Sequence, residues 1–321
     1  MPTMRRLGRS DVEVTPIGLG CWQFSEGHGI SGKFWGALSS EETDTIVAAA
    51  LDHGINWFDT AEVYGNGRSE AALARALKAA GLLPGDVVIA TKWFPVLRTA
   101  ASIKATIDNR LKQLGGFPID LHQVHHWASI ATVKAQMNAM ADLVEAQKIL
   151  TVGVSNFSAR RMRKAHAALA ARGLPLVSNQ MRYSLLDRRI ERDGVMAAAK
   201  ELGITIIAYS PLAQGVLSGK YHDDPASIRA RPGPRKRMSS FRARGLARSR
   251  PLIEELRRIA AAYGATPSQV ALNWLVHFHG DTVVAIPGAT QPRHAVENAE
   301  ATGFHLSPKE LERLDQLSRT F

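Results

Sequence analysis

Short apolar runs alternate along the chain with amphipathic stretches. The apolar runs have the length of strands and lie at residues 17–20, 55–58, 87–91, 119–124, 150–154, 176–179, 204–208 and 282–286. The stretches between them repeat apolar residues every three or four positions, as helices packed on one face do. The expected helices cover residues 40–53, 71–80, 102–114, 132–147, 159–171, 190–202, 251–263 and 291–301. Alternating strands and helices predict parallel βαβ units.

The strand ends at Asp59, Lys92 and His125 follow one another at intervals of 33 residues. In all, eight strand ends fall at Gly20, Asp59, Lys92, His125, Ser155, Gln180, Tyr209 and Pro287. Eight such units predict an α/β fold, a closed (β/α)8 TIM barrel. We also expect an N-terminal β-hairpin at residues 4–14 and an additional C-terminal helix at 307–319. No domain boundary is evident, so one barrel domain is expected over 1–321, with a long irregular loop at 210–250.

Composition narrows the class of protein. With 45% hydrophobic residues the chain can bury a large core, and its one cysteine, Cys21, excludes an intramolecular disulfide. No metal site is expected. The N-terminus lacks the apolar segment of a signal peptide, and the longest uncharged run, 202–219, contains Pro211 and several polar residues. No membrane partner is therefore expected, and the protein is expected to be cytoplasmic.

The net charge of +11 is concentrated in one stretch. Nine basic residues and no acidic one lie between 229 and 250, namely Arg229, Arg231, Arg235, Lys236, Arg237, Arg242, Arg244, Arg248 and Arg250. Only Phe241 is interleaved with them, whereas nucleic-acid binders combine basic residues with several aromatic ones. Nucleic acid is therefore not an expected partner. Two interpretations stay open: a loop that meets the phosphate groups of a small ligand, or a solvated loop without a partner.

Four titratable residues follow successive strands of the predicted barrel. Asp59 and Tyr64 follow the second strand, Lys92 the third and His125 the fourth. The carboxyl ends of barrel strands converge on one face, so these side chains are expected to meet. Each alone has a structural alternative, because Asp59 suits a cap, Lys92 a solvated charge and His125 a buried core histidine. Their equivalent positions favour a shared catalytic site, with His126 as the competitor of His125.

Motifs spread over nearly the whole chain resemble the aldo-keto reductase superfamily. They are Asp59-Thr60-Ala61 with Tyr64-Gly65, Thr91-Lys92, His125, residues 153–157 (GVSNF), Asn179-Gln180, residues 209–212 (YSPL), and residues 286–288 (IPG) leading to Glu297-Asn298. The stretch 210–221 looks like the bacterial and potassium-channel β-subunit branches. The resemblance implies reduction of a carbonyl group to an alcohol with a nicotinamide cofactor.

Charge suggests how the four residues share this chemistry. Reduction of a carbonyl by hydride needs a proton donor, and free tyrosine has a pKa near 10. We expect Lys92 to lower the pKa of Tyr64 and Asp59 to keep Lys92 charged. His125 would donate a hydrogen bond to the carbonyl oxygen. Tyr64 is then the general acid in reduction and the general base in oxidation.

The resemblance also implies a cofactor site. In it, Ser155, Asn156 and Gln180 hold the nicotinamide carboxamide and Tyr209 stacks on the ring. The remaining expected cofactor contacts are Trp22, Ser210, Leu212, Gln214, Gly215, Lys220, Gly288, Thr290, Gln291, His294, Glu297 and Asn298. Branches devoted to NADPH often carry Lys and Arg at the positions of Gly288 and His294. NADPH is therefore the expected cofactor, with Arg293 or an arginine of the 229–244 loop supplying charge, and NADH is the alternative.

Aromatic residues gather in the loops after the first, third and fourth strands. An apolar substrate pocket is expected from Trp22, Phe24, Trp35, Trp93 and Trp127. Aldehydes, ketones or dicarbonyls of modest size fit such a pocket. The sequence makes no prediction about the oligomeric state.

Two other functions compete with carbonyl reduction. A nucleotide-sensing regulatory subunit is the first, although the channel β-subunits carry Asn at the position of His125. A Schiff-base aldolase using Lys92 is the second. It needs a lysine of depressed pKa, and Asp59 opposes that.

Overall fold

The computed structural model describes residues 3–29, 36–230 and 237–321. Eight parallel strands form one sheet, in the order in which they occur along the chain. They are β3 (Leu19–Gly20), β4 (Trp57–Asp59), β5 (Val88–Trp93), β6 (Leu121–Val124), β7 (Thr151–Ser155), β8 (Leu176–Arg182), β9 (Thr205–Tyr209) and β10 (Val283–Ala285). Parallel bridges join Ile17 to Ala285 and Gly20 to Gly288, which closes the sheet. The predicted (β/α)8 barrel is confirmed.

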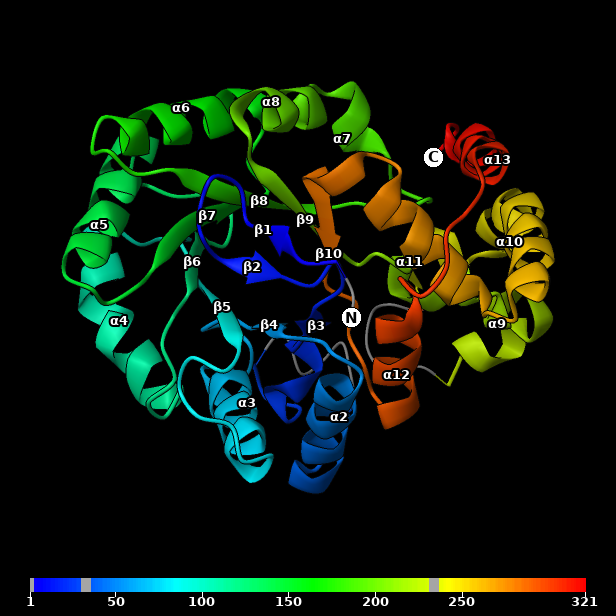
Figure 1. Cartoon of the computed structure of the whole chain (residues 1–321), viewed down its shortest axis with the longest axis horizontal. Coiled ribbons are helices and arrows are strands. Elements are labelled where there is room, and N and C mark those ends of the chain that lie inside the picture. Colours follow the sequence, from blue (N-terminus) through cyan, green and yellow to red (C-terminus); the bar gives the residue numbers. More distant parts are fainter. Residues whose placement is uncertain (1–2, 30–35, 231–236) are drawn as a thin grey trace.

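The N-terminal hairpin lies across one end of the barrel (Figure 1). Its strands, β1 (Arg5–Arg6) and β2 (Glu13–Val14), pair antiparallel. Leu7, Val12 and Val14 are buried in one cluster with Trp57 and Val177, which stand at the starts of β4 and β8. The hairpin therefore seals the amino-terminal end of the barrel and leaves the carboxyl ends of the strands for the site.

Helices surround the sheet, and Figure 1 shows them as an outer ring. They are α2 (Ser40–Asp52), α3 (Arg68–Ala79), α4 (Ala101–Gln113), α5 (Val133–Glu145), α6 (Ala159–Ala170), α7 (Arg189–Arg192), α8 (Val195–Leu202), α9 (Lys220–Asp223), α10 (Ala243–Tyr263), α11 (Pro267–His277), α12 (Pro292–Glu300) and α13 (Pro308–Ser318). The predicted C-terminal helix is α13. Helix α2 begins with a capping box: Ser39 accepts from the Glu42 N–H and the Glu42 carboxylate accepts from the Ser39 N–H.

Residues 210–250 are more regular than predicted. They contain the 3-10 turns η2 (Ala213–Ser218), η3 (Pro225–Ile228) and η5 (Ser239–Phe241) besides α9. Helix α10 begins at Ala243 rather than at Pro251, which lies inside it. The buried residues of this helix lie on both sides of the proline and include Leu246, Leu252 and Ile253. Its apolar face therefore continues through Pro251. The prediction had this helix begin at Pro251.

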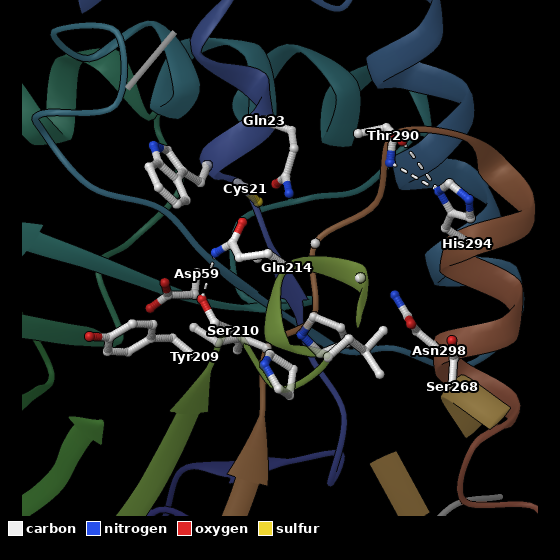
Figure 2. Close-up of a pocket in the computed structure, with 18 of the residues that line it drawn as sticks. Cys21, Gln23, Asp59, Tyr209, Ser210, Gln214, Ser268, Thr290, His294 and Asn298 are labelled. Atoms are coloured by element: carbon white, nitrogen blue, oxygen red, sulfur yellow. Dashed lines mark hydrogen bonds between the residues drawn. The ribbon is translucent and has the colours of Figure 1, made fainter. Parts of the chain in front are cut away.

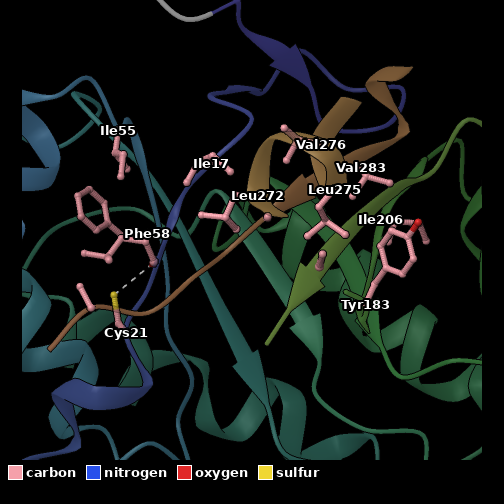
Figure 3. Close-up of a cluster of buried hydrophobic side chains, with 14 of the residues drawn as sticks. Ile17, Cys21, Ile55, Phe58, Tyr183, Ile206, Leu272, Leu275, Val276 and Val283 are labelled. Atoms are coloured by element: carbon pink, nitrogen blue, oxygen red, sulfur yellow. Dashed lines mark hydrogen bonds between the residues drawn. The ribbon is translucent and has the colours of Figure 1, made fainter. Parts of the chain in front are cut away.

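Helix α11 was not predicted. Its residues from Ser268 to Val276 are all buried, so the polar face that marks an amphipathic helix is missing. Figure 3 shows Leu272, Leu275 and Val276 of this helix in the core cluster that also holds Ile206 and Val283 of the barrel. A second difference lies at 190–202, where Gly194, with φ of 85°, separates α7 from α8.

The helices were also compared with the length and apolarity that a membrane-spanning helix needs. Within residues 3–29, 36–230 and 237–321, no helix is both long and apolar enough to cross a membrane.

Candidate active site

A buried ion pair lies at the centre of the carboxyl-terminal face. Lys92 on β5 donates from Nζ to Asp59 Oδ1 at the end of β4, and also to the Thr60 carbonyl at 2.7 Å. The Lys92 side chain is fully buried and that of Asp59 is 2% exposed. A buried pair of charges persists only when further hydrogen bonds satisfy both groups.

Two glutamines provide those hydrogen bonds. The Gln123 and Gln180 amides donate to the second oxygen of Asp59, at 3.1 and 2.8 Å. Gln123 stands on β6 and Gln180 on β8, so strands distant in sequence fix one carboxylate. The side chain of Gln180 is thus directed at Asp59, whereas the resemblance had implied a contact with the nicotinamide carboxamide.

Tyr64 lies over this ion pair. Lys92 Nζ is 5.1 Å from the centroid of the Tyr64 ring. The His125 ring stands edge-on to Tyr64, with 5.6 Å between centroids and an interplanar angle of 80°. Trp22 stacks on the Tyr64 ring, 6.1 Å away, and Phe94 contacts His125 at 5.9 Å. The four predicted residues therefore meet at one point, and Tyr64 and His125 border the same cleft.

The pKa of Tyr64 differs from the expectation. Burial raises the pKa of this hydroxyl well above its usual value, and the Asp59 carboxylate raises it further. Lys92 was expected to lower it, but its ammonium is already paired with Asp59 and acts on Tyr64 as part of a nearly neutral pair. Burial also lowers the pKa of Lys92 and, well below 6.5, that of His125. Tyr64 is therefore a phenol and His125 a neutral imidazole at neutral pH.

The cleft has a volume of about 700 Å³ and extends from Tyr64 to α12. Figure 2 shows Asp59, Tyr209 and Ser210 toward one end and Thr290, His294 and Asn298 toward the other. Nearly all predicted cofactor residues line it: Trp22, Ser155, Asn156, Gln180, Tyr209, Ser210, Leu212, Gln214, Gly215, Lys220, Gly288, Thr290, His294, Glu297 and Asn298. Gln291 does not. It is exposed and accepts a hydrogen bond from Arg293 at 2.7 Å.

The cleft wall is strained and polar. Asn156, Ser210 and Gln214, which line the cleft, have positive φ values between 51° and 61°, which L-residues rarely adopt. Such strain gathers at functional sites. Among the described residues, Gln214 Oε1 and Asn298 Nδ2 are buried without a hydrogen-bond partner, and both residues line the cleft. These amides suit a long polar ligand.

The polar residues beside Tyr209 form a chain of hydrogen bonds. The Tyr209 hydroxyl donates to Asn156 Oδ1 at 2.9 Å, and Asn156 Nδ2 donates to Ser155 Oγ at 2.9 Å. Ser155 Oγ in turn donates to the Gln180 carbonyl at 3.0 Å. The three side chains are therefore held in place before any ligand binds.

The other end of the cleft carries little fixed positive charge. His294 Nδ1 lies 3.3 Å from Thr290 Oγ1, and Arg293 also lines this end. A Cβ atom on Gly288 would come within 2.1 Å of Gln23 Nε2, so the Gln23 amide fills the space beside this glycine. None of the described residues among the nine basic ones at 229–250 lines the cleft, and Arg244, Arg248 and Arg250 lie on α10.

Of the five aromatic residues predicted for the substrate pocket, two are buried in the core and one lies outside the cleft. Phe24 and Trp93 are 0% and 1% exposed and belong to the core. Trp127 is 47% exposed and does not line the cleft, whereas Trp22 does, and Trp35 lies outside the described residues. The sequence places these rings in loops but does not indicate which way each one turns.

Several cleft residues were not predicted. Cys21, Gln23 and Val63 line it beside the predicted residues, as does His126, which the sequence offered only as the competitor of His125. Thr266 and Ser268 enter from the start of α11, a helix that the apolar pattern did not reveal. Had α11 been recognised, its capping residues would have been candidates.

A buried charge cluster lies behind the ion pair. Glu70 accepts from the Thr91 hydroxyl at 2.6 Å and pairs with Arg110 at 3.1 Å. Burial raises the pKa of Glu70 to about 7. Thr91 precedes Lys92 on β5, so this cluster supports the strand that carries the lysine.

No group of His, Cys, Asp or Glu within residues 3–29, 36–230 and 237–321 has the arrangement of a metal site.

A buried Asp–Lys pair thus lies beneath a tyrosine and a histidine at the carboxyl end of a (β/α)8 barrel. The family model for the Aldo/keto reductase family matches residues 16–319. The chain belongs to this family.

Named relatives agree with that assignment. An uncharacterized oxidoreductase of Mycobacterium tuberculosis is 39% identical, over 96% of this chain and 91% of the relative. The chloroplastic pyridoxal reductase of Arabidopsis thaliana is 32% identical, over 96% of this chain and 84% of the relative. An aldo/keto reductase from Klebsiella pneumoniae, solved with NADP and acetate, superposes with a TM-score of 0.74 at 26% identity, over 99% and 96% of the two chains.

Proposed function

We propose that this protein reduces an aldehyde or ketone to an alcohol with NADPH. The observation that carries the proposal is the position of Tyr64, which lies over the buried Lys92–Asp59 pair and beside His125 at the cleft. A reductase needs a proton donor and an oxygen-binding group next to a site for a hydride donor. Family membership supports an oxidoreductase in general, and the geometry supports these particular residues.

The protonation states suit the reducing direction. Because its pKa is raised, Tyr64 retains its proton at neutral pH and is available as a general acid. His125 is neutral, so it donates a hydrogen bond to the carbonyl oxygen without adding a charge. As the oxygen gains negative charge, Tyr64 passes its proton to it.

The cleft fits a dinucleotide cofactor, which supplies hydride from its nicotinamide when bound. Two observations support a ligand of this kind. The cleft is elongated, from Tyr209 to Asn298, and the side-chain amides of Gln214 and Asn298 each bring a buried polar atom without a hydrogen-bond partner to it. Ser155 and Asn156 would hold the nicotinamide end, and Glu297 and Asn298 the adenine end. The Klebsiella pneumoniae relative was solved with NADP, which supports NADPH as the cofactor.

Discrimination between NADPH and NADH would rest mainly on Arg293. This guanidinium is the cation at the end of the cleft formed by Gly288, Thr290 and His294, and it would pair with a 2′-phosphate. Replacement by Gln would remove that charge. We expect Arg293→Gln to raise the KM for NADPH and to leave that for NADH nearly unchanged.

The substrate is proposed to be an aldehyde or ketone of modest size with an apolar body. Trp22 and Phe94 border the cleft beside Tyr64 and His125 and offer aromatic surface to it. A relative named pyridoxal reductase makes pyridoxal a rational member of a first substrate panel.

The test combines turnover with cofactor binding. We expect oxidation of NADPH in the presence of an aromatic aldehyde or pyridoxal, followed at the nicotinamide absorbance band. In Tyr64→Phe we expect the rate to fall by about two to four orders of magnitude, because a general acid contributes that much. Binding of NADPH, measured by fluorescence titration, should change little. Equal turnover by Tyr64→Phe would refute the proposed role.

The same experiment addresses the regulatory-subunit alternative. Tight NADPH binding without turnover on a broad carbonyl panel would favour it. The presence of His125 and the oxidoreductase relatives make it the weaker interpretation.

A further inference from the structure

Large exposed apolar side chains gather on two adjacent loops beside the cleft. Val96 and Leu97, in the loop after β5, are 39% and 85% exposed. Trp127 and Ile130, in the loop after β6, are 47% and 66% exposed. The Ser129 hydroxyl donates to the Arg98 carbonyl at 3.5 Å, so the two loops are in contact. We call Val96, Leu97, Trp127 and Ile130 the apolar rim.

The rim is continuous with the mouth of the cleft. Phe94 and His126 line the cleft and belong to the same two loops. The His126 ring lies 5.2 Å from that of Trp127, which extends the aromatic surface outward from the cleft. A surface that covers the rim therefore also faces the entrance of the cleft.

Leu97 is held in an unusual conformation. Its φ of 57° is left-handed, where a Cβ atom crowds the backbone. Its side chain nonetheless makes little contact with the rest of the protein, since it is 85% exposed. The backbone thus holds an apolar side chain outward at a conformational cost that packing within the chain does not offset. Residues in such conformations gather at active sites, ligand-binding segments and switch regions.

The segments around the rim contain no acidic residues. None occurs in 94–107, 125–141 or 156–186, which contain Arg98, Lys104, Lys134, Arg160, Arg161, Arg163, Lys164, Arg172 and Arg182. These segments form the loops, the amino-terminal parts of α4 and α5, the whole of α6 and strand β8. Helices α4, α5 and α6 lie side by side on the flank of the barrel opposite α10 and α13 (Figure 1). Five of these nine cations pair with carboxylates of other segments, namely Arg98, Lys104, Arg163, Arg172 and Arg182.

Several of these cations lack a counter-charge. Throughout the described part of the chain, no carboxylate lies within ion-pair distance of Lys134, Arg160 or Lys164. Together with Arg161 they line a groove of about 840 Å³ between α5 and α6. The Arg161 guanidinium also lies 5.2 Å from the Trp127 ring, so the basic groove adjoins the apolar rim.

We propose that this face docks on an anionic lipid bilayer, with the apolar rim inserted among the head groups. Protruding aliphatic and tryptophan side chains surrounded by Lys and Arg are the combination that binds such interfaces. An acidic protein would bind the basic groove as well, but Leu97 and Ile130 stand out from the surface instead of lining a groove that a polypeptide would fill. This departs from the expectation that the protein has no membrane partner, and it turns the cleft mouth toward the lipid.

The test measures partition of the intact protein onto vesicles. Vesicles of phosphatidylcholine alone are compared with vesicles that also contain phosphatidylserine. We expect binding only to the anionic vesicles, and a decrease in binding as salt is raised. Leu97→Glu/Ile130→Glu and Arg160→Glu/Lys164→Glu should each lower the partition coefficient by about tenfold or more, because one removes insertion and the other reverses two charges. None of these residues belongs to the proposed catalytic or cofactor site.

Matched controls lie elsewhere on the molecule. Leu83→Glu/Leu150→Glu changes two exposed leucines at the amino-terminal end of the barrel, just before β5 and β7. Arg237→Glu/Arg244→Glu makes the same change of charge in the 229–250 stretch. Both should bind anionic vesicles as the unmodified protein does. Thermal unfolding of each variant establishes that it is folded.

Three results would overturn the proposal. The first is absence of binding to anionic vesicles. The second is equal loss in the rim and control variants, which would indicate non-specific attraction by net charge. The third is binding to polyglutamate or duplex DNA without partition onto vesicles, which would identify a polyanion other than lipid as the partner. Since none of these readouts uses turnover, they are independent of the proposed reductase activity.

Discussion

Replacement of Asp59 by Asn should lower the free energy of unfolding far more than the small change in side-chain volume suggests. Asp59 and Lys92 are buried together, with exposures of 2% and 0%. Two unit charges in contact attract by about 4 kcal/mol or more at an effective dielectric constant of about 20. Asn removes the charge and keeps the shape, so the Lys92 ammonium loses its counter-charge in a site that excludes water.

Measured losses at other buried ion pairs indicate how far the free energy of unfolding should fall. Removing one partner of a buried pair costs about 3–5 kcal/mol of the free energy of unfolding. Gln123 and Gln180 also donate to the carboxylate, and the amide that replaces it in Asp59→Asn could accept from them through one oxygen only. We therefore expect a loss of about 4 kcal/mol at about pH 7, measured by urea unfolding followed by tryptophan fluorescence.

The loss should depend on pH in a defined direction. Burial already lowers the pKa of Lys92, and Asp59 opposes that shift. Without Asp59 the folded-state pKa falls further below 10.5, so the folded variant binds fewer protons than the unfolded chain between the two values. Its free energy of unfolding therefore rises with pH across that window. Asp59→Asn/Lys92→Met should recover part of the loss, because no buried charge remains.

A surface pair provides the control. Lys148 and Asp108 lie 2.6 Å apart with side chains 42% and 73% exposed, so Asp108→Asn should cost at most about 1 kcal/mol. Equal losses in Asp59→Asn and Asp108→Asn would refute the reasoning, as would a loss in Asp59→Asn that does not change with pH.

Three further predictions concern single groups. Burial raises the pKa of Glu70 from 4.5 to about 7, so between these two pH values the folded state keeps a proton on Glu70 that the unfolded chain has lost. The free energy of unfolding should therefore fall by about 3 kcal/mol as the pH rises from 4.5 to about 7. Glu70→Gln should abolish that slope in urea titrations, and an unchanged slope would exclude this group as its source. The imidazole of His125, whose pKa lies well below 6.5, should show no titration near pH 6.5 by NMR, and a midpoint there would contradict its burial. Gly18→Ala would place a Cβ atom 2.3 Å from the Trp57 ring and should lower the free energy of unfolding by about 1–3 kcal/mol. Gly36→Ala, where the added Cβ atom meets open space, should leave it almost unchanged. Similar urea-unfolding midpoints for the two variants would refute the packing argument.

The barrel could be predicted because its strands carry a clear pattern. Buried parallel strands are continuous apolar runs, and each ends at a polar residue where the chain leaves the core. Asp59, Lys92 and Ser155 mark such ends, and the structure places all three at or next to the end of a strand. Convergence at one face then follows from the topology alone.

What could not be predicted depends on contacts across the fold. Helix α11 is buried on all sides, so its pattern has no polar face, and α10 runs through Pro251 because burial of its apolar face outweighs local preference. The orientations of Phe24 and Trp93 depend on packing that a single sequence does not show. The raised pKa of Tyr64 likewise reflects burial, which pairwise reasoning about Lys92 had left out.

The most direct test of the proposed function follows the transferred atom. NADPH carrying deuterium at C4 of the nicotinamide, labelled on one face and then on the other, is incubated with an aromatic aldehyde and the protein. We predict deuterium on the carbinol carbon of the alcohol from one labelled form, and almost none when Tyr64→Phe replaces the unmodified protein. NADPH that binds tightly while neither labelled form delivers deuterium to the alcohol would contradict carbonyl reduction at this site.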